Sequence, residues 1–97
     1  MALSEKFHAE IALYCKEDTE DAEKMAELAA FHDAASAYLD GAGVAEPEEG
    51  TQRRKVWEQV VKALVLDMND RRGTNVDNAA RENPIVRQMI VQLKLTK

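Results

Sequence analysis

Features that cross-link a chain or anchor it in a membrane are scarce in this sequence of 97 residues. Its one cysteine, Cys15, has no partner within the chain, so no internal disulfide stabilises the fold. No uninterrupted apolar run approaches the roughly 18 residues that a membrane-spanning helix needs. The stretch from Met1 to Lys6 also lacks the charged-then-apolar layout of a secretory signal. We therefore expect a protein with no membrane partner that folds in the cytoplasm.

Aromatic residues are few, and alternating strand patterns are short. The five aromatic residues are Phe7, Tyr14, Phe31, Tyr38 and Trp57, so the core must be mostly aliphatic. A chain of this length buries only about 60–65% of the surface that its unfolded form exposes, and so small a core often gains stability from neighbouring subunits. Because no strand-like alternation exceeds about four residues, we expect a single all-α domain spanning residues 1–97.

Charge is distributed unevenly along the chain, whose net charge is −5. Residues 1–50 hold three basic and thirteen acidic residues, a net charge of −10, whereas residues 51–97 hold ten basic and five acidic residues, a net charge of +5. If the two halves expose different faces, copies attract one another head to tail, which is the geometry of rings and filaments. The alternative is an acidic helix beside a basic helix in one monomer.

Apolar periodicity predicts a small bundle of about four helices, and the polar segment 74–82 is predicted to have no regular element. The predicted helices cover about residues 5–16, 20–39, 54–68 and 84–95. The two long helices, joined by an exposed loop at 40–52, are expected to form an antiparallel pair. Shorter N-terminal and C-terminal helices complete the bundle.

Each predicted helix has one apolar face and recognisable end signals. The predicted faces are Phe7, Ile11 and Tyr14 with Ala12 and Cys15; Met25, Leu28, Ala29, His32, Ala35 and Leu39, flanked by Ala22, Ala26 and Tyr38; Val56, Trp57, Val60, Val61, Leu64, Val65 and Met68; and Ile85, Val86, Met89, Ile90 and Leu93. The expected starts are Ser4, Asp18 or Thr19, and Asn83 followed by Pro84; the expected stops are Gly41, Gly43 and Gly73.

No set of residues has the spacing of a metal site. The segment 67–71 begins like a calcium loop, but Arg71 and Arg72 occupy the fifth and sixth positions, where an oxygen ligand and a glycine are needed. The twelfth position is Asn78 instead of a glutamate. We expect no bound metal and no cofactor.

A catalytic site is equally unsupported. Cys15 and His32 are conceivable as a nucleophile and its base, but no oxyanion-hole sequence or glycine-rich turn accompanies them. The simpler interpretation is that Cys15 is a small buried hydrophobe and that His32 is a satisfied residue near the core. We therefore expect no catalytic residues and no enzyme activity.

Basic residues flank the third predicted helix, which raises the possibility of nucleic-acid binding. They are the runs 53–55 and 71–72. The apolar face of this helix is wide, and the chain as a whole is acidic, so the electrostatic attraction to DNA is weak. A small helical DNA-binding or regulatory protein from a mobile element is the alternative function.

Several short pieces occur in a distinctive order along the chain. They are Glu20-Asp21, Ala37-Tyr38-Leu39, Asp70-Arg71-Arg72-Gly73 and Met89-Ile90-Val91-Gln92-Leu93-Lys94. This order, which covers most of residues 10–95, resembles that of the small head-tail connector (adaptor) proteins of long-tailed phages, also described as DNA-packaging proteins. The chain departs from the family pattern at 67–69, where aromatic residues are common, and in its acidic loop at 46–49.

The resemblance implies a non-enzymatic assembly protein at the head-tail interface of a virion, present in the host cytoplasm during assembly. Subunits would form a ring of about 12 copies between the portal protein and a tail-side head-completion protein. DNA would pass through the ring without sequence-specific binding.

Two groups of contact residues follow as hypotheses. The acidic second helix of one subunit would face the basic third or last helix of the next, through Glu20, Asp21, Glu27, Arg53, Arg54, Arg71, Arg72 and Arg87. The C-terminal segment, which is short, basic and apolar together, would contact the portal through Gln92, Lys94, Leu95 and Lys97.

Overall fold

The computed structural model describes residues 3–71 and 75–95, and these residues form five helices and no strand. The helices are α1 (Glu5–Tyr14), α2 (Ala22–Gly41), α3 (Gln52–Asp70), α4 (Val76–Glu82) and α5 (Pro84–Leu95). The prediction of an all-α bundle is confirmed. Three of the residues singled out above, Arg72, Gly73 and Lys97, lie outside the described part of the chain.

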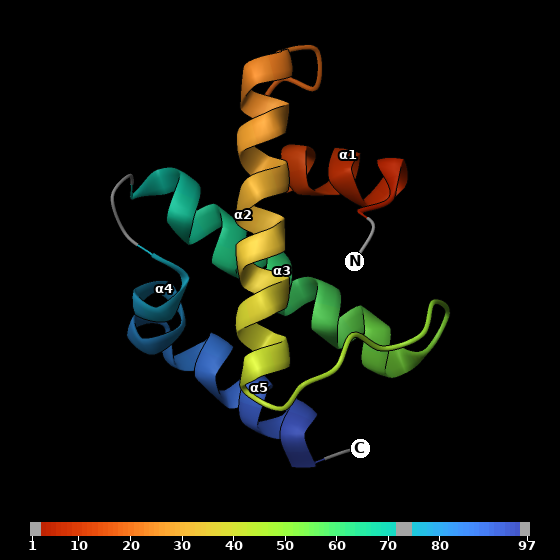
Figure 1. Cartoon of the computed structure of the whole chain (residues 1–97), viewed down its shortest axis with the longest axis vertical. Coiled ribbons are helices and arrows are strands. Elements are labelled where there is room, and N and C mark those ends of the chain that lie inside the picture. The colour runs from red at the N-terminus through yellow and green to blue at the C-terminus, as the bar shows by residue number, and fades with distance from the viewer. Residues whose placement is uncertain (1–2, 72–74, 96–97) are drawn as a thin grey trace.

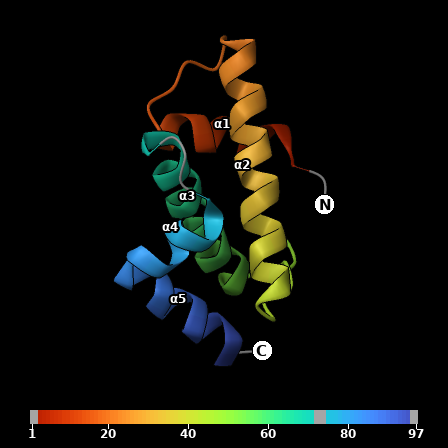
Figure 2. The same ribbon diagram turned by 60° about the vertical axis from the view of Figure 1, so that its left-hand side comes forward.

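Helix α3 is the centre of the bundle and packs against α1, α2, α4 and α5. The long helix α2 makes the most extensive contact with it. Figure 1 shows that α3 runs back in the opposite sense to α2 but crosses it obliquely, so the two do not lie alongside each other over their whole length. Figure 2 shows α2 and α5 on either side of α3.

The core is aliphatic around one tryptophan, as the sequence predicts. The predicted face of α3 is buried except for the half-buried Val56, and Trp57, Val60, Val61, Leu64 and Val65 are fully covered. Leu28, Ala35 and Leu39 of α2 pack against this face, together with His32. The flanking residues Ala22 and Ala26 were expected near the core, but both are exposed.

Helix α1 is shorter than predicted and turns one expected core residue outward. Ser4 caps it by accepting a hydrogen bond from the backbone N–H of Phe7 at 3.1 Å. The helix ends at Tyr14, because Lys16 adopts a positive φ of 58°, which an α-helix cannot continue. Phe7 and Ile11 are buried, but Tyr14 is exposed, and its prediction as a core residue is wrong.

The start and end of α2 have clear local causes. The N-cap is Asp21, whose carboxylate accepts from the backbone N–H of Lys24 at 3.1 Å, and not the predicted Asp18 or Thr19. At the other end Gly43 has a φ of +92°, and the N–H groups of Gly43 and Val44 bond back to the carbonyls of Asp40 and Leu39. This is a Schellman motif, and the buried Val44 supplies its hydrophobic contact.

Helix α4 is the element that the sequence did not predict. Asn75 caps it by accepting from the N–H of Asn78 at 2.9 Å, and Ala79 and Ala80 are its buried residues. Two alanines suffice because their small side chains let this short helix approach the core closely. Val76 also packs against the core and is partly buried, and the other side chains are polar. The segment therefore lacks the continuous apolar stripe that marked the other helices.

Helix α5 begins as predicted, with Asn83 as cap and Pro84 as its first residue. The side-chain oxygen of Asn83 accepts from the N–H groups of Ile85 and Val86 at 3.1 and 3.2 Å. Its buried residues are Val86, Ile90 and Leu93. Ile85 was expected in the core but is 70% exposed, because it lies on the side of the helix turned away from α3.

Candidate interaction surfaces

Arg54, one of the residues hypothesised at a subunit interface, is buried inside the subunit. Its guanidinium forms ion pairs with Glu46 at 2.6 Å, Glu58 at 3.0 Å and Glu49 at 3.2 Å. It also donates to the backbone carbonyl of Pro47 at 3.1 Å. Burial alone lowers the pKa of Arg54, but the hydrogen bonds to Glu46 and Glu58 outweigh it and raise the pKa above its ordinary value.

This cluster gives the acidic loop at 46–49 a structural role that the sequence did not reveal. Arg54 lies in the first turns of α3, and three of its partners, Glu46, Pro47 and Glu49, belong to the loop that leads from α2. The loop is thereby fastened to the helix that follows it. Arg54 is engaged within the subunit rather than offered to a neighbour.

The acidic residues hypothesised at the interface lie at the start of α2. Asp21 is the helix cap, and Glu20 is exposed beside it. Glu27 accepts a hydrogen bond from Lys24 Nζ at 2.7 Å. Lys24 also donates to Asn69 Oδ1 at 2.9 Å, and Asn69 Nδ2 donates to Glu17 Oε2 at 2.7 Å. This polar network joins the loop after α1, the start of α2 and the end of α3.

Among the described residues, the other hypothesised basic side chains differ in their surroundings. Arg71 pairs with Glu82 and, at 3.9 Å, with Asp67, so it links the end of α3 to α4. The pairing with Glu82 raises the pKa of Arg71. Arg53 is half-buried beside a hollow that Gln92 of α5 also lines, whereas Arg87 is exposed on α5.

Cys15 and His32 occupy positions that suit a core and not a reactive pair. Burial raises the pKa of the Cys15 thiol to about 11, and the carboxylates of Asp70 and Glu17 add to the effect. A thiol with this pKa is protonated at neutral pH and is a poor nucleophile. His32 packs edge-on against Phe7, with ring centroids 5.8 Å apart, and its Nδ1 lies 3.1 Å from Asp33 Oδ1.

The described residues contain neither a metal-binding cluster nor a membrane-spanning helix. No three histidine, cysteine, aspartate or glutamate side chains between residues 3–71 and 75–95 gather as a metal site would require. In the same ranges no helix combines the length and the apolar character needed to cross a membrane.

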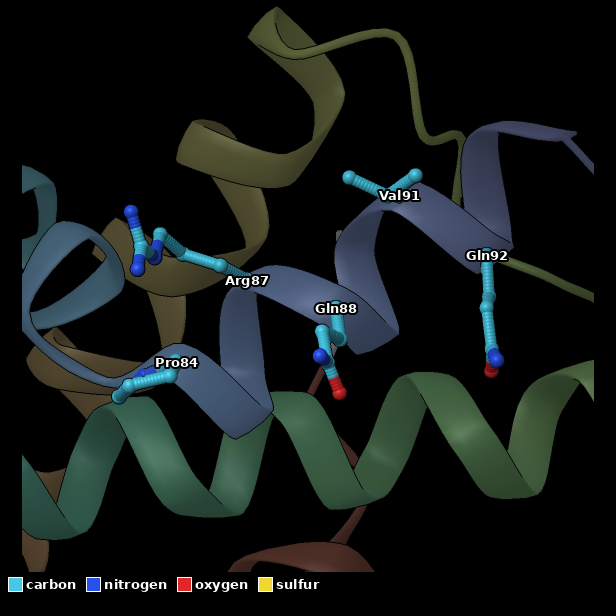
Figure 3. Close-up of a pocket in the computed structure, with 5 residues that line it drawn as sticks. All are labelled: Pro84, Arg87, Gln88, Val91 and Gln92. Carbon is cyan, nitrogen blue, oxygen red and sulfur yellow. The ribbon is translucent and has the colours of Figure 1, made fainter.

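The outer face of α5 is an open surface with an apolar centre. A shallow hollow of about 650 Å³ is lined by Pro84, Arg87, Gln88, Val91 and Gln92, which project from successive turns of this one helix (Figure 3). A small-molecule site is normally enclosed by several elements, so this hollow is better suited to a protein surface. Of the residues hypothesised to contact the portal, Gln92, Lys94 and Leu95 are exposed on α5.

The outer face of α2 carries a second hollow of about 440 Å³, which sequence reasoning did not identify. It is lined by Asp33, Ser36, Ala37 and Asp40. The buried Ser36 hydroxyl oxygen has no hydrogen-bond partner among the described residues. The i, i+7 spacing of the two aspartates was the available signal, because residues seven apart share a helix face.

The chain has no significant match to a protein-family model, to a curated protein or to a solved structure.

Proposed function

We propose that this chain is the subunit of a phage or prophage head-tail connector, a non-enzymatic ring between the portal and the tail-side proteins. The observation that carries the proposal is where the family-like pieces lie in the fold. Asp21 caps α2, the segment 37–39 is in the last turns of α2, and Asp70 and Arg71 end α3. The segment 89–94 forms the second half of α5. The pieces that resemble the family therefore mark helix ends in the order the resemblance implies.

The distribution of exposed groups supports an assembly role. Ile85, Val91 and Leu95 leave large apolar side chains exposed on α5, and Leu13 does so on α1. Val91 and Leu95 share one face of α5, and exposed apolar side chains grouped in this way are typical of surfaces that bind another protein. In the proposed function these surfaces contact sister subunits, the portal and the head-completion protein at the head-tail interface of the virion.

The central position of α3 argues against the alternative function. A recognition helix must expose one face to enter the major groove of DNA. Here α3 packs against four helices, and Arg54, the middle residue of its basic run, is buried in ion pairs. Arg54 is therefore not free to contact DNA from this helix.

The proposed function is tested by reconstitution with the portal protein encoded in the same genome. The purified chain is mixed with assembled portal and analysed by sedimentation and electron microscopy. We expect a ring of additional density on the portal. A gel shift with random and genomic DNA is the parallel measurement, and tight sequence-specific DNA binding without any portal binding would overturn the proposal in favour of the regulator.

A further inference from the structure

We propose that the outer face of α5 docks on the outer face of α2 of a second copy of this chain. The inference rests on the proposed ring-forming function and names the contact that joins neighbouring subunits. Four features of the two faces carry it: exposed apolar side chains, exposed charges, matched spacing and placement on either side of α3.

The α5 face is apolar along its centre and exposed along its length. Pro84, Gln88, Val91 and Leu95 follow one another at intervals of four, three and four residues and form a single stripe on the helix. Leu95 is 79% and Val91 52% exposed. No described segment of the subunit covers Val91 or Leu95.

Arg87 and Lys94 lie along one side of the α5 stripe. Both are exposed, and within residues 3–71 and 75–95 neither forms an ion pair. Other arginines of the chain, by contrast, are paired: Arg54 with Glu46, Arg71 with Glu82 and Arg81 with Asp77. The two cations of the α5 face are therefore available to carboxylates of another molecule.

The α2 face has the complementary character. Ala26, Ala30 and Ala37 form an exposed stripe of small side chains, which allows the backbone of another helix to approach closely. Asp33 and Asp40 lie along one side of this stripe and are exposed. Asp40 has no ion pair in the part of the chain that the structure describes, whereas Asp33 Oδ1 lies 3.1 Å from His32 Nδ1 on its own helix.

The spacing of the charges matches between the two faces. Asp33 and Asp40 are seven residues apart, as are Arg87 and Lys94, and seven residues of an α-helix rise about 10.5 Å. When the two helices lie along each other, both carboxylates can meet both cations at once, with Ala37 opposite Val91. Both charge pairs lie on the same-handed flank of their stripes, and same-handed flanks of two packed helices meet only when the helices run antiparallel. The contact is therefore antiparallel, with Asp33 near Lys94 and Asp40 near Arg87.

Each subunit can use its α2 face with one neighbour and its α5 face with another, so the contact can repeat from subunit to subunit. The two faces differ, and α2 and α5 lie on either side of α3 (Figure 2). A contact between unlike surfaces is heterologous, and it closes into a ring or continues as a filament. Because α5 is only 12 residues long, the pairwise contact is smaller than a standard interface of about 800 Å² per partner, and we expect association that depends strongly on concentration and salt.

Cysteine cross-linking tests the assignment directly. Ala37→Cys and Val91→Cys are prepared as separate variants, with the protonated and buried Cys15 left in place. A mixture of the two should form a disulfide-linked heterodimer under mild oxidation. The matched control mixes Ala37→Cys with Leu13→Cys, because Leu13 is 71% exposed on α1. Equal cross-linking of the control, or dominant pairing of Ala37→Cys with itself, would overturn the proposal.

Charge reversal tests the ionic part and gives the helix orientation. Asp40→Lys should weaken self-association about tenfold, since it sets like charges opposite each other. Mixing it with Arg87→Glu should restore binding, because Asp40 lies near Arg87 when the helices are antiparallel, whereas mixing it with Lys94→Glu should not. Rescue by neither variant counts against docking, provided that circular dichroism shows each variant to be folded.

The outcomes separate this inference from the proposed function. If the chain forms rings on the portal but cross-links through other positions, the assigned faces are wrong and the connector function stands. If residues 37 and 91 cross-link but no portal or tail protein binds, the contact stands and the connector function fails. A chain that is monomeric at all concentrations and low ionic strength overturns the docking.

Discussion

The guanidinium carbon of Arg54 lies 4.6 Å from the centre of the Trp57 ring, and both side chains are buried. A cation over an aromatic face is attracted by the ring quadrupole, and the attraction grows when water is excluded. Arg54 thereby connects two parts of the molecule. Its charged edge binds the acidic loop, and its flat face rests on the aromatic cluster of Trp57, Phe7 and His32.

We predict that Arg54→Met lowers the free energy of unfolding by about 3 kcal/mol. The substitution leaves Glu46 and Glu58, which are largely covered, without their cation, and breaking a buried pair on one side costs about 3–5 kcal/mol. Urea denaturation followed by the fluorescence of Trp57, the single tryptophan, measures the change. Lys55→Met, at an exposed neighbouring position, is the control and should change stability by less than about 0.5 kcal/mol. Equal effects of the two variants would contradict the role of Arg54.

We predict that Asn69→Ala lowers stability by about 2 kcal/mol. Asn69 is buried, and its amide satisfies both Lys24 and Glu17. In the alanine variant Lys24 loses the acceptor and Glu17 loses the donor that the Asn69 amide supplies. A buried polar group without a hydrogen-bond partner lowers stability by about 1–3 kcal/mol. Thermal unfolding by circular dichroism is the measurement, and Gln59→Ala, exposed on the same helix, should have little effect.

We predict that Asn83→Ala loosens α5 and costs about 1 kcal/mol. Its side-chain oxygen accepts from two backbone N–H groups at the helix start, and losing such a cap typically costs about that much. Amide hydrogen exchange should accelerate in the first turn of α5. Asn83→Asp keeps an acceptor and should retain most of the protection from exchange. If both variants accelerated exchange equally throughout the chain, the effect would not be local capping.

We predict that stability falls as the pH rises from about 9 to about 11, in part because of Cys15. Burial raises the pKa of this thiol from 9.0 to about 11, so the folded state favours the protonated form. Its contribution is complete below the pKa of the unfolded chain and is lost as the pH rises through the pKa of the folded chain. The loss amounts to about 2 kcal/mol.

The comparison with Cys15→Ala isolates the thiol, since lysines and tyrosines titrate in the same range. The difference between the denaturation midpoints at pH 8 and pH 10.5 should be smaller in that variant than in the unmodified chain. An independent check is the rate of reaction with a disulfide reagent at pH 8, which we expect to be about 100-fold slower in the folded than in the unfolded chain. A fast reaction in the folded state would contradict the raised pKa.

The helices that the sequence predicted are those with a continuous apolar stripe. In α3 the spacing of Trp57, Val60, Val61 and Leu64 predicted both the element and its buried face, which the structure confirms. The cap at Asn83 followed by Pro84 likewise predicted the start of α5. These features are local, because they depend on helix periodicity and on backbone groups within one turn.

The interaction surfaces were less predictable. The overall separation of charge was visible in the sequence, but the exposed pair Asp33 and Asp40 was not singled out, and Arg54 was assigned to a contact between subunits. Arginine suits a surface and a buried ion pair equally well by composition. The environment of Arg54 depends on how the loop at 46–49 packs against α3, and helix periodicity does not predict the path of a loop.

The sequence by itself determined that the chain is helical, where four of its helices lie and which apolar residues of α3 face the core. Only the tertiary structure decided that α3 is central and that a fifth helix packs on the core through Ala79 and Ala80. It also decided that the outer faces of α2 and α5 are exposed among the described residues. The physical reason is that an amphipathic helix specifies which of its faces needs cover, while the crossing of its neighbours decides how much of the rest stays exposed.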